Sequence, residues 1–128
     1  MERFLGKYSP QLYILMRVVI GLMFACHGAQ KQLGAFGGTT PPMFNQFWIG
    51  GVIELVGGVL IAVGLFAGYA AFVCSGMMAA AYWMAHGTRS LFPLVNGGEL
   101  AALYCFVFLL IAAQGAGRWS VDGRYSRR

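Results

Sequence analysis

Four apolar windows run along the chain, and each is long enough to cross a bilayer as a helix. They cover about residues 12–33, 47–66, 69–86 and 97–114, and a spanning helix requires roughly 17 to 25 apolar residues. The windows lack the strict alternation of apolar and polar residues that indicates a strand, and inside lipid only helices and closed barrels satisfy the backbone. The pattern therefore predicts an all-α fold, a four-helix transmembrane bundle that forms one domain over residues 1–128.

The composition also indicates an integral membrane protein. Hydrophobic residues make up 59% of the chain and charged residues only 10%, and there are 19 glycines, whereas a soluble domain is about half apolar. Arg3 and Lys7 precede the first window, as in a signal peptide, but Arg17 interrupts the apolar run and no clear cleavage site of small residues follows. We therefore interpret this window as a retained first span.

Basic residues indicate the orientation. An even number of spans places both termini on one side, which then carries Arg3, Lys7, Arg118, Arg124, Arg127 and Arg128. Because positive residues mark the cytoplasmic side, the sequence predicts cytoplasmic termini and a multi-pass protein of the plasma (inner) membrane, with Trp119 at the inner interface. The net charge of +5 is explained by contact with anionic lipid headgroups, so it does not indicate a nucleic-acid partner.

Small residues form a stripe on the second span. They are Gly50, Gly51, Gly57, Gly58 and Gly64. Such stripes let helix backbones approach closely, and the short turn near residues 67–68 makes the second and third spans antiparallel neighbours. We expect Ala71, Ser75 and Ala79 to provide the matching surface. Besides the lipid bilayer, the partners expected from these Gly-rich faces are other membrane proteins or a second copy of the chain.

Several ionisable residues lie in or at the edge of the apolar windows, where they are costly and usually functional. They are Arg17, His27, Glu54, His86 and Glu99, with Lys31 one helical turn after His27. At about 1.5 Å per residue, His27 and Glu54 share a level near the outer face. His86 ends the third span and Glu99 begins the fourth on that same side, whereas Arg17 lies in the cytoplasmic half and can extend inward or toward Glu54.

Two interpretations of this polar cluster remain open. In the structural one, Glu54 pairs with Arg17 or His27 to fix the helix register, and Lys31 and Glu99 are headgroup anchors. In the functional one, two imidazoles and two carboxylates form a pocket at the outer face that binds a ligand and exchanges protons. Tyr82, Trp83 and Tyr104 can supply its aromatic walls, although aromatic belts at the membrane interface are the commoner role.

The remaining residues argue against several other kinds of site. Cys26, Cys74 and Cys105 are dispersed within the predicted spans, which disfavours a thiol oxidase and a zinc site. His27 and His86 lie on alternate helices, an arrangement that haem ligands can have. Lone histidines in membranes more often form hydrogen bonds or relay protons, so haem is disfavoured and no metal ligands are assigned. No nucleotide-binding fingerprint is present, so no nucleotide cofactor is expected. The discontinuous helices typical of secondary transporters are not visible in the sequence, so transport is only a residual possibility.

Motifs spread along the chain resemble the DoxX family of small four-span membrane proteins. They comprise Arg17, Gly21, Phe24, His27-Gly28 and Lys31; Gly50-Gly51, Glu54, Gly57-Gly58 and Gly64-Leu65; Gly97-Gly98-Glu99; and Gly117-Arg118-Trp119-Ser120-Val121-Asp122-Gly123. Relatives in that family resemble membrane subunits of sulfur and redox systems, including a thiosulfate:quinone oxidoreductase and an assembly with a sulfurtransferase and a superoxide dismutase. The resemblance implies a quinone-linked or thiosulfate-linked site.

The function expected from these features is that of a quinone-interacting membrane subunit, with quinone as the cofactor. In this prediction His27 and Glu54 are catalytic: a histidine, His27 or His86, bonds a quinone carbonyl, and Glu54 or Glu99 accepts protons. The residues expected to contact the quinone are Arg17, His27, Lys31, Glu54, Tyr82, His86 and Glu99. The alternative is a non-catalytic accessory or scaffolding subunit of a larger membrane complex, and the sequence leaves open whether the protein is an enzyme.

Overall fold

The computed structural model describes residues 1–125, and these residues contain helices and no strand, which confirms the all-α prediction. In chain order the elements are α1 (Glu2–Leu5), η1 (Gly6–Tyr8), α2 (Ser9–Leu33), η2 (Ala35–Gly37), α3 (Gln46–Val63), α4 (Ala67–Tyr82), η3 (Trp83–Gly87), α5 (Pro93–Asn96), α6 (Glu99–Gln114) and α7 (Val121–Tyr125). Of these, η1 and η2 are short 3-10 turns and η3 is a π-helical turn that continues α4. The predicted lipid contacts of Arg127 and Arg128 lie outside the described residues.

Within residues 1–125, two helical stretches are long and apolar enough to span a membrane. They are Glu2–Leu33, which joins α1, η1 and α2, and Gln46–Val63, which is α3. The helix α6 is apolar but shorter. The third and fourth predicted windows correspond in position to α4 with its π-helical turn and to α6.

Residues with special backbone conformations end the long helices. α2 ends at Gly34 and α3 ends at Gly64, both in the left-handed conformation with φ of 64° and 74°, which glycine adopts without steric cost. The side chain of Asn45 caps the start of α3 by accepting hydrogen bonds from the amides of Phe47 and Trp48 at 2.7 and 3.0 Å. These local signals fix where the helices turn back on one another.

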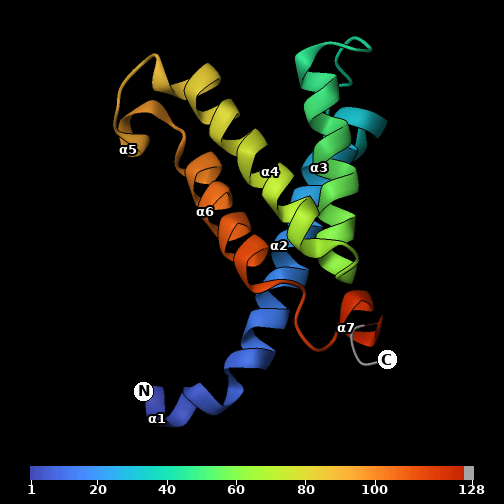
Figure 1. The fold of residues 1–128 in the computed structure, drawn as a ribbon. Coiled ribbons are helices and arrows are strands. Elements are labelled where there is room, and N and C mark those ends of the chain that lie inside the picture. Colours follow the sequence, from blue (N-terminus) through green and yellow to red (C-terminus); the bar gives the residue numbers. More distant parts are fainter. Residues whose placement is uncertain (126–128) are drawn as a thin grey trace.

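The four long helices pack as two close pairs, α2 with α3 and α4 with α6, whereas α3 and α4 contact each other less extensively. Figure 1 shows α3 and α4 meeting at their short connection and diverging away from it. We call this end, where the turn 64–66 and α7 lie, the short-turn end. The opposite end, which carries segments 34–45 and 87–98, is the long-loop end. The N-terminal α1 and the C-terminal α7 both lie toward the short-turn end (Figure 1).

Glycines allow the close approach of α2 and α3. A methyl group at Gly21 would lie 2.7 Å from the backbone nitrogen of Ala62, and one at Gly58 would lie 2.5 Å from that of Ala25. The expectation that the glycine stripe of α3 faces α4 is therefore wrong for Gly58, which packs on α2. Gly57 does face α4, where it adjoins the sulfur of Cys74. Most of the stripe is thus used inside this chain.

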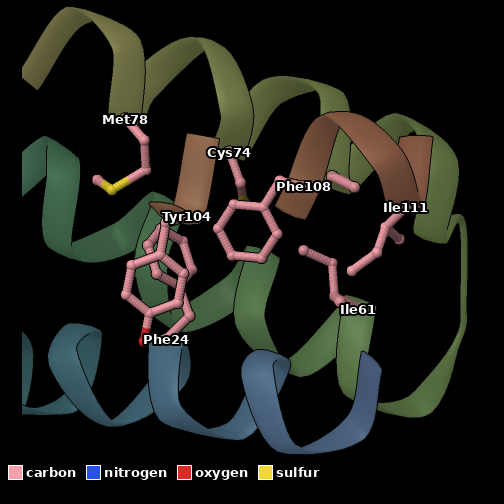
Figure 2. Packing of buried hydrophobic residues seen from close by; sticks show 8 residues of the cluster. Phe24, Ile61, Cys74, Met78, Tyr104, Phe108 and Ile111 are labelled. Carbon is pink, nitrogen blue, oxygen red and sulfur yellow. The ribbon is translucent and has the colours of Figure 1, made fainter. Parts of the chain in front are cut away.

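Apolar side chains from all four long helices meet in one core. Figure 2 shows Phe24 of α2, Ile61 of α3, Cys74 and Met78 of α4, and Tyr104, Phe108 and Ile111 of α6. The rings of Phe24 and Phe108 are 4.7 Å apart and nearly perpendicular, a favourable aromatic arrangement. Large apolar side chains also cover much of the exposed surface, among them Leu22, Val56, Phe72 and Phe106. Such a surface suits contact with lipid.

The C-terminal segment binds the short-turn end. Arg17 is buried, with 1% of its surface exposed, and it donates hydrogen bonds to the carbonyl oxygens of Ile61, Ala62 and Trp119. Arg17 therefore binds the carboxyl end of α3, where free carbonyls favour a cation, and it does not extend toward Glu54. Trp119 itself is exposed.

Asp122, in α7, completes this arrangement at the beginning of α4. Its carboxylate accepts hydrogen bonds from the amides of Phe66 and Ala67 at 2.9 and 3.0 Å. Its own amide donates to the carbonyl of Gly64 at 2.9 Å. Asp122 acts as the cap of α4, so one helix end is stabilised by a residue distant in the sequence.

Candidate functional site

A cavity of about 220 Å³ opens between α3 and α4 toward the long-loop end. Its walls are mainly apolar and include Phe47, Met77, Met78, Ala81 and Met84. Its polar lining residues are Gln46, Lys31 and Glu54. The volume is somewhat below that of pockets for drug-sized ligands, which begin near 300 Å³, so the cavity can take a single ring or a small polar group.

An ion pair lies at this cavity. The Nζ atom of Lys31 donates to Oε1 of Glu54 at 2.7 Å. The side chain of Glu54 is 6% exposed and that of Lys31 is 34% exposed, so the carboxylate is inside the protein and the ammonium at its edge. Glu54 is thus paired with Lys31, in place of the Arg17 or His27 partner considered from the sequence.

The second carboxylate oxygen of Glu54 is unpaired within residues 1–125. Oε2 is buried and makes no hydrogen bond to any residue in the described part of the chain. A buried carboxylate oxygen without a partner is energetically unfavourable. Because Glu54 also lines the cavity, this free acceptor can receive a hydrogen bond or a proton from a bound molecule.

Small residues position the ion pair. A methyl group at Gly51 would lie 2.7 Å from Cβ of Lys31, so the absence of a side chain at Gly51 leaves room for Lys31 to cross α3 toward Glu54. Gly28 lies against Leu55 and brings the two helices together at the same level. Gln32 extends the contact by donating to the carbonyl of Trp48 at 2.8 Å. The approach of α2 to α3 therefore determines which cation reaches Glu54.

Tyr104 and His27 do not line this cavity, and Tyr104 packs against Phe24 in the core. The Tyr104 hydroxyl is buried and has no hydrogen-bond partner within residues 1–125. The His27 ring is edge-on to the Tyr104 ring, with centroids 6.3 Å apart. His27 is partly exposed and lines a smaller cavity with Cys26, Gln30 and Phe36. His27 is therefore accessible at this smaller cavity and is separate from the Lys31–Glu54 ion pair.

His86 and Tyr82 belong to a hydrogen-bonded network that supports segment 87–98. Nδ1 of His86 is 3.0 Å from the carbonyl oxygen of Asn96. The Asn96 amide donates to the Tyr82 hydroxyl at 2.9 Å, and that hydroxyl donates to the carbonyl of Leu91 at 3.1 Å. Neither His86 nor Tyr82 lines the cavity beside Glu54. The two residues connect the end of α4 to the loop before α6.

The structure therefore brings together only part of the predicted site. Lys31 and Glu54 meet, and His27, Tyr82 and His86 lie at the same long-loop end in two other groups. Glu99 is exposed at the first turn of α6, and Arg17 binds the opposite end of the molecule.

Sequence reasoning did not identify the methionines that line the cavity or the pairing of Lys31 with Glu54. Met77 and Met78 of α4 and Met84 of η3 recur at helical spacing, a pattern that by itself indicates an ordinary core face. The available signal was the level of Lys31, which lies one turn from His27 on the helix facing Glu54. Methionine side chains are flexible and fill irregular apolar space, so they suit a ligand wall.

The chemistry available at the cavity is binding and proton exchange. Lys31 supplies an N–H donor, and Glu54 supplies a buried carboxylate with one free oxygen. A ligand with an apolar ring and a carbonyl group fits this donor, acceptor and wall set. Within residues 1–125, no group of three or more His, Cys, Asp or Glu side chains is placed to hold a metal ion.

Comparison with known proteins shows which family the chain resembles. The DoxX family model matches residues 12–87, from α2 to the π-helical turn. The chain is 40% identical over 134 residues to an uncharacterized protein of Haemophilus influenzae, covering 97% of this chain and 98% of that protein. It is 30% identical over 160 residues to an uncharacterized membrane protein of Mycobacterium tuberculosis, covering 98% and 88%.

No solved structure matches the chain. The matched region contains the α2–α3 pair, the Lys31–Glu54 ion pair and the cavity walls from α4. The match covers more than half of the chain, and the two relatives align with almost all of it. The protein is therefore a membrane protein that belongs to the DoxX family.

Proposed function

We propose that this protein is a quinone-interacting subunit of the plasma (inner) membrane, with four spans and cytoplasmic termini. The observation that carries the proposal is the apolar cavity beside the Lys31–Glu54 ion pair, whose buried carboxylate has one oxygen without a partner in residues 1–125. A quinone combines an apolar ring with carbonyl oxygens that accept hydrogen bonds. The cavity offers the complementary surfaces.

In this proposal Lys31 binds and orients the ligand, and Glu54 exchanges protons with it. The Lys31 ammonium donates a hydrogen bond to a quinone carbonyl, since it has three N–H donors and only one is used by Glu54. Reduction of a quinone to a quinol takes two electrons and two protons. Glu54 supplies a proton site at the ring, and the electrons come from a partner protein or a small reductant of the thiosulfate class.

His27 keeps a role in the proposal as a proton donor on the route from the surface. It is partly exposed and lies one turn before Lys31 on α2, and an imidazole can donate a proton at one ring nitrogen and accept one at the other. Tyr82, His86 and Glu99 are given no ligand contact, because they do not line the cavity. Their proposed place is in the support of segment 87–98 and at the start of α6.

Binding of a short-chain quinone to the purified protein in lipid nanodiscs tests the proposal. We expect binding to the native protein and a Kd about 10-fold to 100-fold higher for Lys31→Gln and for Glu54→Gln, because a hydrogen bond to a charged group contributes about 1.5–3 kcal/mol. Glu99→Gln is the matched control, since its carboxylate is exposed and outside the cavity. Absence of binding to the native protein, or an equal loss in Glu99→Gln, would refute the proposal.

A second candidate function is a non-catalytic accessory subunit of a larger membrane complex. One observation favours it: Gly76 and Ala80 are exposed one turn apart on α4, and a side chain at Gly76 would meet no atom within 4 Å. Pairs of small residues at this spacing allow another helix to approach closely. Gly76→Leu should then abolish copurification of a partner, whereas under the quinone proposal it leaves ligand binding unchanged.

A further inference from the structure

A second cavity lies between the same two helices, toward the short-turn end. Its volume is about 360 Å³, and its lining is apolar: Ile53, Val56 and Leu60 from α3, and Tyr69, Val73 and Cys74 from α4 are among the residues that form it. It lies on a part of the molecule that exposes large apolar side chains, including Val56 at 53% and Val73 at 55%.

The two cavities adjoin each other along α3 and α4. On α3 the lining positions pass from Gly50 and Glu54 in the first cavity to Gly57 and Leu60 in the second, at intervals of three or four residues. Residues at this spacing lie above one another on a helix. The second cavity therefore continues the first in the direction of the short-turn end.

The lining positions on α4 show the same continuity. They pass from Ala70 and Val73 in the second cavity to Met77, Ala81 and Met84 in the first, again at intervals of three or four residues. We call the two cavities together the α3–α4 groove. On α3 the lining positions run from Gly50 to Leu60, over which a helix rises about 15 Å, so the groove extends through about half of a hydrocarbon layer about 30 Å thick.

The groove exists because α3 and α4 pack closely only at a few small residues. Gly50 and Gly57 provide no side chain to fill it, and Gly57 adjoins the sulfur of Cys74 midway along. Figure 1 shows the two helices diverging from their connection. In a membrane, the apolar part of this groove suits a chain that has no hydrogen-bonding groups.

We propose that the α3–α4 groove binds the alkyl or isoprenoid tail of the same quinone whose head group binds at Lys31 and Glu54. The inference rests on the proposed function and names its substrate class: quinones with a long apolar tail. The polar end of the groove provides the head-group contacts, and the apolar end continues about 9 Å further along α3, from Glu54 to Leu60, a length that a ring alone does not fill. The tail lies along α3 and α4 with its free end toward the turn 64–66.

The test compares a quinone without a tail and one with a long tail, both bound to protein in nanodiscs and both expressed as concentrations in the membrane. The tail already lies in an apolar phase, so its gain comes from packing against the groove. Expressing each Kd as a concentration in the membrane removes partition into lipid, and we compare the ratio of the two Kd values between variants. The native protein should favour the tailed quinone, and Val56→Trp, which fills the groove, should reduce that preference by about tenfold, or about 1.4 kcal/mol.

Val59→Trp is the matched control. Val59 is on the same helix, is exposed to a similar extent (46% against 53% for Val56), and lines neither cavity. Both variants place a tryptophan on an exposed position, so both should fold. Only Val56→Trp should change the ratio.

The outcomes separate this inference from the proposed function. If the tailless quinone binds and the ratio is the same in the native protein, Val56→Trp and Val59→Trp, the groove does not hold the tail, although the head-group site stands. If neither quinone binds, the proposed function fails and the inference fails with it. If ordinary phospholipid competes with the tailed quinone as strongly as unlabelled tailed quinone does, the groove binds acyl chains in general and the inference is refuted.

Discussion

Glu54 depends on a single cation for compensation of its charge. One oxygen of the carboxylate binds Lys31 at 2.7 Å, and the other is buried without a partner in residues 1–125. A buried charge that loses its partner is costly, whereas a pair removed as a whole leaves no charge behind. The ion pair should therefore behave as one unit when it is mutated.

Replacement of Lys31 should destabilise the protein more than replacement of both partners. We expect Lys31→Met to lower the free energy of unfolding by about 3 kcal/mol, the lower end of the range for breaking a buried pair, since the lysine is partly exposed. The double variant Lys31→Met with Glu54→Gln should recover most of that loss. Thermal unfolding in detergent measures both.

Lys7→Met is the control for loss of a lysine, because Lys7 is exposed and lies over the rings of Phe4 and Tyr8. If the double variant is no more stable than Lys31→Met, then Glu54 is not charged in the native protein, or it has another cation.

For the partner of Glu54, the sequence predicts the depth of each side chain in the bundle but not which side chains meet. Helical rise gives the depth of a side chain and correctly places Lys31 and Glu54 near one end. It does not give the rotation of each helix. That rotation is set by Gly28 against Leu55 and by Gly51 against Lys31, contacts between backbones that hydrophobic patterns do not specify. For this reason the sequence alone does not select the partner of Glu54 among Arg17, His27 and Lys31, and the packing of α2 on α3 does.

At the scale of the elements, the α2–α3 pair depends on glycine at the points of closest approach. A methyl group at Gly28 would lie 2.7 Å from Cβ of Leu55 and nearer still to its backbone. Backbone atoms cannot move aside as a flexible side chain can, so the helices themselves must separate. Lys31 lies less than one turn beyond Gly28, and its pairing with Glu54 follows from the same approach.

Gly28→Ala should destabilise the protein by about 1–3 kcal/mol, the usual cost of overpacking. Gly76→Ala provides the matched control, because nothing lies within 4 Å of the added methyl group. It should be neutral or stabilise the helix by up to about 1 kcal/mol, since alanine favours helices more than glycine does. Unfolding of both variants under the same conditions provides the comparison. Equal effects would show that the α2–α3 contact is not as close as described.

The cap of α4 is the second prediction at this scale. Asp122→Ala removes the acceptor for the Phe66 and Ala67 amides, and we expect a loss of about 1 kcal/mol. Asp122→Asn keeps one acceptor oxygen and should lose less. Hydrogen exchange at the first turn of α4 measures the effect directly, because opening of that turn exposes these amides. Unchanged exchange in Asp122→Ala would mean that α7 does not hold the turn.

At the scale of elements, the contacts of the C-terminal segment are a feature that sequence patterns do not predict. Its arginines and Trp119 suggest a tail on the lipid surface, and Trp119 is indeed exposed. The binding of Asp122 to α4 and of Arg17 to the Trp119 carbonyl joins residues about 55 and 102 positions apart. No local pattern encodes such pairs. The helices themselves were more accessible to prediction, since apolar length and the glycines at 34 and 64 mark them in the sequence.

At the scale of the whole molecule, the two helix pairs divide the structure by polarity as well as by packing. The ion pair and the Tyr82–His86–Asn96 network lie toward the long-loop end, whereas Arg17, Asp122 and both terminal helices lie toward the short-turn end (Figure 1). The helices between them carry exposed apolar side chains. This distribution allows one orientation in which lipid surrounds the middle and the two ends face opposite aqueous compartments.

The excess of Lys and Arg near the short-turn end predicts which compartment that end faces. Positive residues remain in the cytoplasm, so we expect segment 34–45 outside the cell membrane and Arg118 inside it. Single cysteines at these places, in a chain whose Cys26, Cys74 and Cys105 are replaced by alanine, test the orientation. Thr39→Cys and Arg118→Cys suit this purpose because both positions are exposed.

A thiol reagent that does not cross membranes should label Thr39→Cys in intact cells and Arg118→Cys only after the cells are opened. Labelling of Arg118→Cys in intact cells would place the termini outside. Lys31 and Glu54 would then face the cytoplasmic half of the bilayer, and any protons taken up at Glu54 would come from the cytoplasm. The orientation therefore decides the side from which a quinone bound in the α3–α4 groove receives its protons, and this labelling experiment measures it without reference to the ligand.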